Sequence, residues 1–377
     1  MPSPDPQRRG QPDGPIRYGI IGTGMMGVEH IANIAAIDGA EVVAVADPDE
    51  GSLAAAVAAC KVGDEGGADG SEPVAAYGDH HDLLAADDVD AVVVASPNMT
   101  HVDVLLDVLE TDLHILVEKP LCTTVEDCRR VIEAATNPAQ VVQVGLEYRW
   151  MAPVARLIDE LETGVIGRPR MVAMREHRFP FLVKVGDWNR FSTNTGGTLV
   201  EKCCHFFDLM NLIVGERPTR VFASGAQDVN HLDEVYDGRR SDILDNAYVI
   251  VEYPGGARAC LDLCMFADAT HDQEEISVVG ENGKLEALIP SDELRIGRRG
   301  EHWIGSVETR DVEPDAPVPG LHHGSSYHEH VAFLNAITTG NPPPVTLDDG
   351  LWSVAVGVAA HRSIDEGRPV WLEEVLG

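Results

Sequence analysis

A lysine follows directly on an apolar run that has the composition of a buried strand. The run covers residues 114–117, and Glu118-Lys119-Pro120 comes next. Ligands of parallel α/β sheets bind beyond the carboxyl ends of the strands, so Lys119 and its neighbour Glu118 would face a ligand there. The alternative is an ordinary surface salt bridge of Lys119. Pro120 fixes the direction in which the chain leaves the strand, and a cis peptide bond is one way to do so.

A histidine with carboxylates at helical spacing is the second candidate for chemistry. Glu201, His205 and Asp208 are separated by four and three residues and share one face of the helix predicted over residues 197–214. A carboxylate one turn away can orient an imidazole and make it a base. Two alternatives stay open: Thr198 and Glu201 have the spacing of a capping box, and His205 alone could be a packed core residue.

No metal site is predicted from this segment, although Cys203 and Cys204 directly precede the histidine. Adjacent cysteines on a helix point about 100° apart and cannot easily bind one ion. A histidine-rich stretch, with His322, His323 and His330 among its members, shows no clear set of carboxylate partners. Part of that stretch could still line a cleft.

A glycine-rich turn identifies the element that would bring a cofactor to these residues. Gly22, Gly24 and Gly27 have the G-x-G-x-x-G spacing between an apolar run at 16–21 and a helical pattern at 24–37. The first glycine permits the turn, the second admits a pyrophosphate and the third lets the helix pack on the strand, with the helix N-terminus facing the phosphates. A turn without a ligand is the alternative. The loop residues between the glycines are Thr23, Met25 and Met26.

Two further strand ends complete the predicted cofactor site. Asp47 ends the apolar run 42–46, twenty residues after Gly27, where it can bind the ribose hydroxyls of an adenosine. Its charge disfavours a 2′-phosphate, and Pro48 and Asp49 supply no cation, so NAD is favoured over NADP. The run 91–95 is followed by Ser96-Pro97-Asn98 and then His101. Asn98 and His101 could contact the nicotinamide ribose, whereas Asn98 or Thr100 could instead cap the next helix.

The order of the predicted strands and helices that must position these residues changes near Gly145. The first part alternates strands (16–21, 41–46, 74–77, 91–95, 114–117, 141–144) with helices (24–37, 52–60, 79–86, 99–110, 124–136), which indicates a doubly wound parallel sheet of the Rossmann type. Residues 63–72 resemble a surface insertion. The second part has helices at 152–163, 197–214, 328–338 and 348–366 and strand-like runs at 168–177, 219–225, 246–253, 257–265, 274–279, 284–289 and 293–297.

These patterns predict a fold that is α/β followed by α+β. We expect a disordered tail over residues 1–15, a nucleotide-binding domain over 16–145 and a substrate-binding α+β domain over 146–377, whose last helix can pack back on the first domain. The second domain would carry a large, open, mainly antiparallel sheet. An open sheet face is economically covered by a second copy of the chain, so we expect a homodimer or homotetramer.

Bulk properties exclude several classes of partner. The 377 residues carry a formal net charge of −34, which argues against nucleic acid or an anionic membrane as a partner. The chain has no apolar run of transmembrane length, and its N-terminus lacks the apolar region of a signal peptide. Seven scattered cysteines suit reduced thiols, so we expect a cytoplasmic protein. The acidic composition fits either a high-GC genome or a salty cytoplasm.

Taken together, the motifs resemble those of the glucose–fructose oxidoreductase/inositol dehydrogenase (Gfo/Idh/MocA) family. The resemblance implies an enzyme that uses NAD(P) to oxidise or reduce a secondary alcohol on a sugar, inositol or related polyol. It also implies that Lys119 and His205 hold the reacting hydroxyl, with an acidic residue four positions before the histidine. That residue is Glu201 here, where the family has Asp. The resemblance extends from Ile16 to Leu372 and rests on Gly22-Thr-Gly-Met-Met-Gly27, Asp47, Ser96-Pro97-Asn98 with His101, Glu118-Lys119-Pro120, Gly145-x-x-Tyr-Arg149, and Gly196-Gly197 leading to His205-x-x-Asp208.

The sequence therefore predicts an NAD-dependent dehydrogenase in which Glu201 orients His205 as the base. Two alternatives are an NAD-dependent glycosidase that oxidises its substrate transiently and a non-catalytic NAD-sensing regulator, although a regulator need not keep Lys119 and His205. Trp188 could stack on a sugar ring or simply pack. The residues predicted to contact the substrate are Tyr148, Arg178, Asp187, Trp188, Asn194 and Tyr327.

Overall fold

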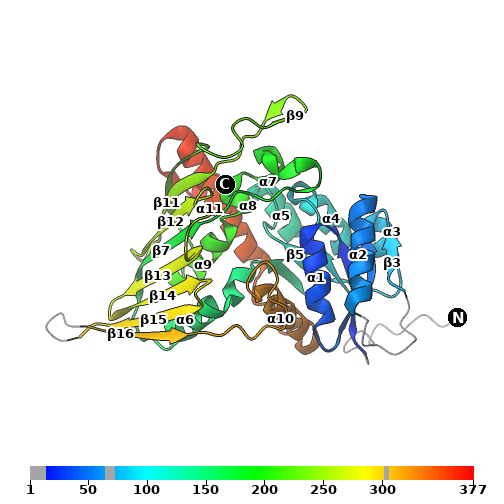
Figure 1. Cartoon of the computed structure of the whole chain (residues 1–377), viewed down its shortest axis with the longest axis horizontal. Helices are drawn as coiled ribbons and strands as arrows, with labels where there is room; N and C mark the ends of the chain where they lie inside the picture. Colours follow the sequence, from blue (N-terminus) through cyan, green and yellow to red (C-terminus); the bar gives the residue numbers. More distant parts are fainter. Residues whose placement is uncertain (1–13, 64–72, 301–304) are drawn as a thin grey trace.

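Two sheets and the helices between them make up the computed structural model, which describes residues 14–63, 73–300 and 305–377. Most of the expected N-terminal tail and nearly all of the expected insertion at 63–72 lie outside the described residues. In Figure 1 the first sheet lies at the right with helix α1 in front of it, and the second sheet lies at the left. No helix in the described part of the chain is both long and apolar enough to cross a lipid bilayer.

The first sheet has six parallel strands in the order β3-β2-β1-β4-β5-β6. The order reverses at β1, so a crevice forms beyond the carboxyl ends of β1 and β4, where such sheets bind ligands. Its strands are almost continuously apolar because helices cover both faces. Their bounds are β1 Ile16–Ile21, β2 Ala40–Ala46, β3 Ala75–Tyr77, β4 Ala91–Val94, β5 His114–Glu118 and β6 Val142–Gly145.

The connections of this sheet are short helices whose apolar faces pack on the strands. Leu83 illustrates the fit, because a Cβ added to Gly19 in the middle of β1 would lie 2.8 Å from the Leu83 side chain. Asp79 and Thr124 cap two of the helices with their side chains. The bounds are α1 Met25–Ala35, α2 Glu50–Gly63, α3 His80–Leu84, the 3₁₀ turn η1 Asn98–Thr100, α4 His101–Leu109 and α5 Val125–Ala134.

The second sheet has nine strands in the order β16-β15-β14-β13-β7-β12-β11-β8-β17. All neighbours are antiparallel except β12 and β7, which run parallel. Each central strand alternates buried and exposed residues, which is typical of a sheet with one covered face. The bounds are β7 Pro169–His177, β8 Arg220–Ala226, β11 Asn246–Glu252, β12 Arg258–Cys264, β13 Glu274–Gly280, β14 Gly283–Ile289, β15 Glu293–Arg298, β16 Ser306–Asp311 and β17 Val370–Trp371.

One face of this second sheet packs on helices, and one of these helices also touches the first sheet. Helix α11 contacts β8 on one side and α5 and β6 on the other, and in Figure 1 it runs between the two sheets. Helix α10 packs on α1, where Phe333 lies edge-on to Tyr18 of β1. The helices and turns of this part are η2 Glu147–Trp150, α6 Ala152–Glu162, η3 Val185–Arg190, α7 Ser192–Thr195, α8 Thr198–Glu201, α9 Cys204–Val214, α10 Ser325–Thr339, α11 Leu347–Glu366 and α12 Glu373–Leu376.

The other face of the second sheet carries exposed apolar side chains. Tyr248 on β11 is 68% exposed and Met171 on β7 is 60% exposed. Ile250 on β11 lies opposite Phe222 of β8 and Cys260 of β12, so these three side chains form a row across the middle of the sheet. A contiguous apolar surface of this kind is typical of a protein–protein contact.

Three local predictions differ from the structure. Residues 197–214 form two short helices, α8 and α9, separated at Lys202 and Cys203, instead of one. The alternative of a capping box is also wrong. The Thr198 hydroxyl donates a hydrogen bond to the carbonyl oxygen of Leu244 at 2.7 Å, and the N-cap is Gly197. The hairpin β9 Val235–Tyr236 and β10 Arg239–Arg240, and the edge strand β16, are polar segments that the apolar pattern missed.

Candidate active site

The glycine turn after β1 is shaped by contacts that leave no room for larger side chains at two positions. A Cβ on Gly22, whose φ is +90°, would lie 2.4 Å from the backbone nitrogen of Ser96, and one on Gly27 would lie 2.2 Å from the carbonyl oxygen of Gly22. Gly24 has open space instead, since no atom of the described chain lies within 4 Å of its Cβ position. The N-terminus of α1 therefore stays accessible at Gly24, and a pyrophosphate needs such access in order to bind there.

The end of β2 reaches this turn through Asp47. Its Oδ2 accepts hydrogen bonds from the backbone nitrogen of Thr23 at 2.7 Å and from the Thr23 hydroxyl at 3.1 Å, and its Oδ1 accepts one from the nitrogen of Asp49 at 2.8 Å. The predicted neighbours Asp47 and Thr23 are therefore in contact. Of the two loop methionines, Met25 is exposed and Met26 is half-buried.

The loop after β4 holds two predicted cofactor contacts, Asn98 and His101, which differ in whether their polar side-chain atoms have partners within the protein. Asn98 is buried, and within the described residues its Nδ2 has no hydrogen-bond partner, so this amide is available to a ligand. His101 is different: its Nδ1 lies 2.9 Å from the carbonyl oxygen of Pro120 and its Nε2 lies 3.0 Å from that of Ser96. Both ring nitrogens therefore face backbone carbonyl oxygens, and His101 links the loop after β4 to the loop after β5. The structure gives no support to the expected contact of His101 with the ribose.

Lys119 follows β5 and is surrounded by carboxylates. The Lys119–Pro120 peptide bond is cis, as the sequence allowed. Burial alone would lower the pKa of Lys119, but the charges of Glu118, Glu147 and Glu201 outweigh burial and raise it. Burial likewise opposes ionisation of Glu118, yet a hydrogen bond from His30 at 3.0 Å and the charge of Lys119 hold the Glu118 pKa at about 2. An ammonium group therefore persists at this strand end at neutral pH.

His205 lies on α9 and is almost completely buried. Its ring stacks on that of Tyr148 with centroids 4.0 Å apart and an interplanar angle of 9°. Burial lowers the pKa of His205 well below its ordinary value, and the charges of Lys119 and Lys202 lower it further. The imidazole is thus neutral at physiological pH and can accept a proton, while the lysine that influences it is charged.

Two family models match the chain, one on each part. Residues 16–146 match a model described as the NAD-binding Rossmann fold of an oxidoreductase family, and residues 158–372 match the C-terminal alpha/beta domain of the same family, Gfo/Idh/MocA. The chain belongs to this family. Its members are oxidoreductases, and this chain is accordingly an NAD-binding oxidoreductase that acts on CH–OH groups.

Individual relatives agree with the family assignment over nearly the whole chain. Myo-inositol 2-dehydrogenase of Thermotoga maritima is 30% identical over 372 residues, with 96% of this chain and 100% of the relative covered. The crystal structure of a probable dehydrogenase from Thermotoga maritima superposes with a TM-score of 0.76 at 27% identity and covers 96% of this chain and 100% of its own. Levoglucosan dehydrogenase in complex with NADH and levoglucosan shares the fold, with a TM-score of 0.79 at 20% identity over 95% and 99% of the two chains.

The acidic residue in the family's histidine motif is Glu201 in this Gfo/Idh/MocA chain, and its surroundings differ from the prediction. Burial raises the Glu201 pKa to about 7, opposed by the charges of Lys119, Lys184 and Arg190. One Glu201 oxygen, Oε2, has no hydrogen-bond partner among the residues described. The carboxylate placed beside His205 is instead Glu147, with Oε1 3.7 Å from the His205 Nε2. Glu201 interacts with the charges of the lysines, and within the described residues its side chain makes no hydrogen bond or ion pair with His205.

A second buried network lies behind the stacked tyrosine. Lys202 contacts the Tyr148 hydroxyl oxygen at 2.5 Å and the Glu176 Oε1 at 2.8 Å, and Arg178 pairs with the same Glu176 oxygen at 3.2 Å. Burial raises the pKa of nearby Glu274 to about 7. Lys202 is thus an ion-pair partner inside the protein. Its contact with the Tyr148 hydroxyl holds the tyrosine ring in position, and the His205 ring stacks on that ring.

Most of the predicted substrate contacts have partners inside the protein. Arg178 donates to Glu176 and to the carbonyl oxygen of Phe179, and the Asn194 amide donates to the carbonyl oxygen of Trp188 at 2.9 Å. Asp187 has a φ of +52° in η3, and Tyr327 lies on α10 against the ring of His328. Tyr148 is the predicted substrate residue that the fold brings against His205.

Two residues at the site, Glu147 and Lys184, were not named from the sequence, and His322 was named only within a stretch of which part could line a cleft. Glu147 lies between His205 and His322, whose Nε2 is 3.6 Å from its Oε1. His322 also lies 3.6 Å from Glu29, so the view that the histidine-rich stretch lacks carboxylate partners is wrong for this residue. Lys184 interacts with Lys119 and Glu201, and its place in the segment between Arg178 and Asn194, already a candidate for substrate contacts, was the signal that could have found it.

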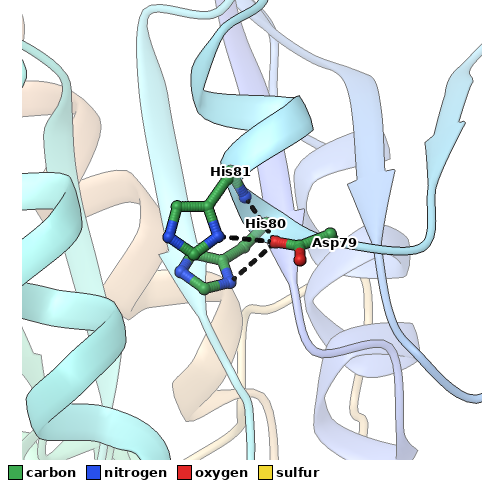
Figure 2. Close-up of side chains that lie close together, drawn as sticks. All are labelled: Asp79, His80 and His81. Atoms are coloured by element: carbon green, nitrogen blue, oxygen red, sulfur yellow. Dashed lines mark hydrogen bonds and ion pairs between the residues drawn. The ribbon is translucent and has the colours of Figure 1, made fainter.

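A separate group of metal-binding residue types lies on the surface at α3. Asp79, His80 and His81 have ligand atoms within 4.8 Å of one another, as Figure 2 shows. Asp79 is the N-cap of α3, and its Oδ1 accepts hydrogen bonds from the backbone nitrogen of His81 at 2.9 Å and from the His81 ring at 2.7 Å. A helix cap accounts for this arrangement, so the group carries no metal assignment.

The two tight glycines and the open one should respond differently to alanine. We expect Gly27→Ala to destabilise the fold by about 1–3 kcal/mol, because its methyl group overlaps the Gly22 carbonyl oxygen. Gly24→Ala should leave the melting temperature unchanged and weaken NAD binding roughly tenfold or more, because its methyl group fills the approach to the helix N-terminus. Calorimetry of melting and of NAD binding separates the two effects. Equal melting of both variants would contradict this geometry.

Proposed function

We propose that the enzyme oxidises a secondary alcohol of a cyclic polyol, with an inositol as the first candidate. The proposal is supported by the 30% identical relative, which is named a myo-inositol 2-dehydrogenase and aligns over its full length. The feature that carries it is the electrostatic coupling of two buried groups: carboxylates raise the pKa of Lys119, and burial together with the charge of Lys119 lowers the pKa of His205. A donor and a proton acceptor that converge on one hydroxyl group are what alcohol oxidation requires.

In the proposed mechanism, Lys119 and His205 act on the same substrate oxygen. NAD⁺, when bound, supplies C4 of the nicotinamide as the acceptor of the hydride from the substrate carbon. Lys119 donates a hydrogen bond to the hydroxyl oxygen and stabilises the negative charge that develops on it. His205 accepts the hydroxyl proton. Asp47 and the N-terminus of α1 bind the adenosine and the pyrophosphate, and Asn98 offers its free amide to the cofactor.

The charges around this pair favour an uncharged, hydroxyl-rich substrate. The site holds two amino groups, those of Lys119 and Lys184, and two carboxyl groups, those of Glu201 and Glu147. A sugar acid would meet these buried carboxylates, whereas the hydroxyl groups of a neutral polyol can donate hydrogen bonds to them. Glu201, with an unpartnered oxygen and a pKa of about 7, is the acceptor we propose for a neighbouring substrate hydroxyl.

Replacing the charged donor tests the mechanism. Lys119→Met should lower kcat/KM for NAD⁺-dependent oxidation of myo-inositol by roughly 10²–10⁴, because the oxyanion loses its donor and His205 its charged neighbour. NAD binding, measured by calorimetry, should change less than about twofold. The matched control is Lys284→Met, at a half-exposed lysine on β14 that pairs with Glu286. Wild-type turnover in Lys119→Met would contradict the assignment.

The same assay separates this function from its nearest alternative. A dehydrogenase accumulates NADH in step with the ketone that it forms. A glycosidase that oxidises its substrate only transiently would cleave a glycoside and show no net NADH. Product analysis over a panel of inositols, aldoses, anhydrosugars and glycosides therefore identifies both the reaction and the substrate.

We also propose that the open face of the second sheet pairs with a second copy of the chain. Tyr248, Ile250 and Phe222 form an exposed apolar surface over the central strands β11 and β8. The paired Tyr248→Asp and Ile250→Asp substitution should convert the assembly to monomers in light scattering, because each carboxylate would lose its water at the contact. Val229→Asp, at an exposed residue outside the sheet, is the control. An unchanged mass in the doubly substituted protein would exclude this face.

A further inference from the structure

The proton taken by His205 has to leave a buried position in every turnover. Oxidation of a secondary alcohol by NAD⁺ gives a ketone, NADH and one proton. His205 is 1% exposed, so its ring cannot pass that proton to bulk water directly. A second turnover requires His205 to be neutral again. This requirement rests on the proposed function, in which His205 is the base.

Glu147 is the acidic group that faces the Nε2 of His205. Its Oε1 lies 3.7 Å from that nitrogen, and its side chain is 2% exposed. Among the described residues neither of its carboxylate oxygens has a hydrogen-bond partner. An unpaired buried carboxylate costs free energy, which a purely structural role does not explain. The separation is too short for an intervening water, and catalytic hydrogen bonds are commonly long before the substrate binds.

His322 continues the path from Glu147 toward the surface. Its Nε2 lies 3.6 Å from the Glu147 Oε1, and its Nδ1 lies 3.6 Å from the Oε1 of Glu29. The His322 side chain is 18% exposed, so this ring reaches solvent where His205 does not. Glu29 is held by hydrogen bonds from the backbone nitrogen of Leu321 and the hydroxyl of Ser326, each at 3.1 Å. One imidazole thus bridges two carboxylates from different parts of the chain.

Charged and titratable groups face Glu147 from every element that surrounds it. Burial raises the Glu147 pKa, the His322 charge lowers it and the Glu118 charge raises it again. A carboxyl group in this balance can accept a proton from an imidazolium and release it. The groups facing it are Glu118 at the end of β5, Lys119 directly after it, Cys204 and His205 on α9, His322 before α10, and Glu329 on α10.

We propose that Glu147 and His322 conduct the substrate proton from His205 to solvent. The substrate O–H bond breaks as an N–H bond forms on His205. The Nε2–H bond of His205 then breaks as an O–H bond forms on the Glu147 Oε1, and that proton moves on to the Nε2 of His322. His322 releases a proton from Nδ1 to water, directly or through Glu29. His205 and Glu147 have then given up the substrate proton, and one proton leaves for each NADH formed. Because His322 gains its proton on Nε2 and loses one from Nδ1, its ring regains the first tautomer by exchanging protons with water before the next turnover.

The test compares proton release with NADH formation in stopped flow, using NAD⁺, myo-inositol and a pH indicator in weak buffer. In the wild-type enzyme the proton and NADH should appear together. In Glu147→Gln NADH should still form in the first turnover, whereas proton release should lag behind it and steady-state kcat should fall roughly 10-fold to 100-fold. Added formate, a small carboxylate base, should restore part of the kcat of this variant.

The matched control is Glu329→Gln. Burial and three neighbouring carboxylates raise the Glu329 pKa well above its ordinary value, so this residue is already protonated and glutamine should change neither rate. Proton release in step with NADH in Glu147→Gln, or the same lag in Glu329→Gln, would overturn the path. His322→Asn, at the half-exposed end, gives the same lag if Glu147→Gln does not fold. Absence of NADH with the wild-type enzyme would instead count against the proposed function, on which the path rests.

Discussion

The structure depends on keeping one buried ammonium group charged at the end of β5, among carboxyl groups from both parts of the chain. Burial works against the charge of Lys119, and carboxylates from three separate elements offset that cost: Glu118 ends β5, Glu147 lies in η2 and Glu201 ends α8. The same charge, together with Lys202, keeps His205 unprotonated. Lys119 has to stay protonated while His205 stays unprotonated. Because the two residues come from different parts of the chain, those parts must be held in a fixed arrangement.

Buried polar contacts make that relation specific. The Glu118 carboxylate is held by His30 of α1, and the other ring nitrogen of His30 lies 2.9 Å from His330 of α10, so three elements from distant parts of the sequence meet behind Lys119. On the other side, Arg149 of η2 holds Asp208 of α9 in a bidentate pair. Apolar packing of α11 between the sheets supplies bulk stability, whereas these polar contacts fix how the segments that carry Lys119 and His205 are placed relative to each other.

The parts of this arrangement that could be predicted are local in sequence. The turn from Gly22 to Gly27, Asp47 at a strand end and Lys119 at another are each specified by neighbours within a few residues, and the strands of the first sheet follow from their apolar runs. Glu147 could not be found this way, because a lone Glu has no local signature and its importance comes from burial beside distant residues. Lys184 and His322 lie in segments that the sequence marked as candidates for the site, but the tertiary structure decides which residue of each segment enters it. Glu201 and His101 show the converse error: spacing suggested partners that the tertiary structure replaced with lysines and with backbone carbonyls.

The most direct test of the central claim is the protonation state of His205 itself. Nuclear magnetic resonance of the intact protein with isotope-labelled histidine, with the His205 signal assigned from a His205→Gln variant, reports whether that ring is neutral without any need for substrate. The structure predicts that the His205 signal stays that of a neutral imidazole as the pH falls through the ordinary histidine value of about 6.5, and that Lys119→Met raises the His205 pKa. A His205 that titrates at the ordinary histidine value of about 6.5, unaffected by Lys119→Met, would contradict the account.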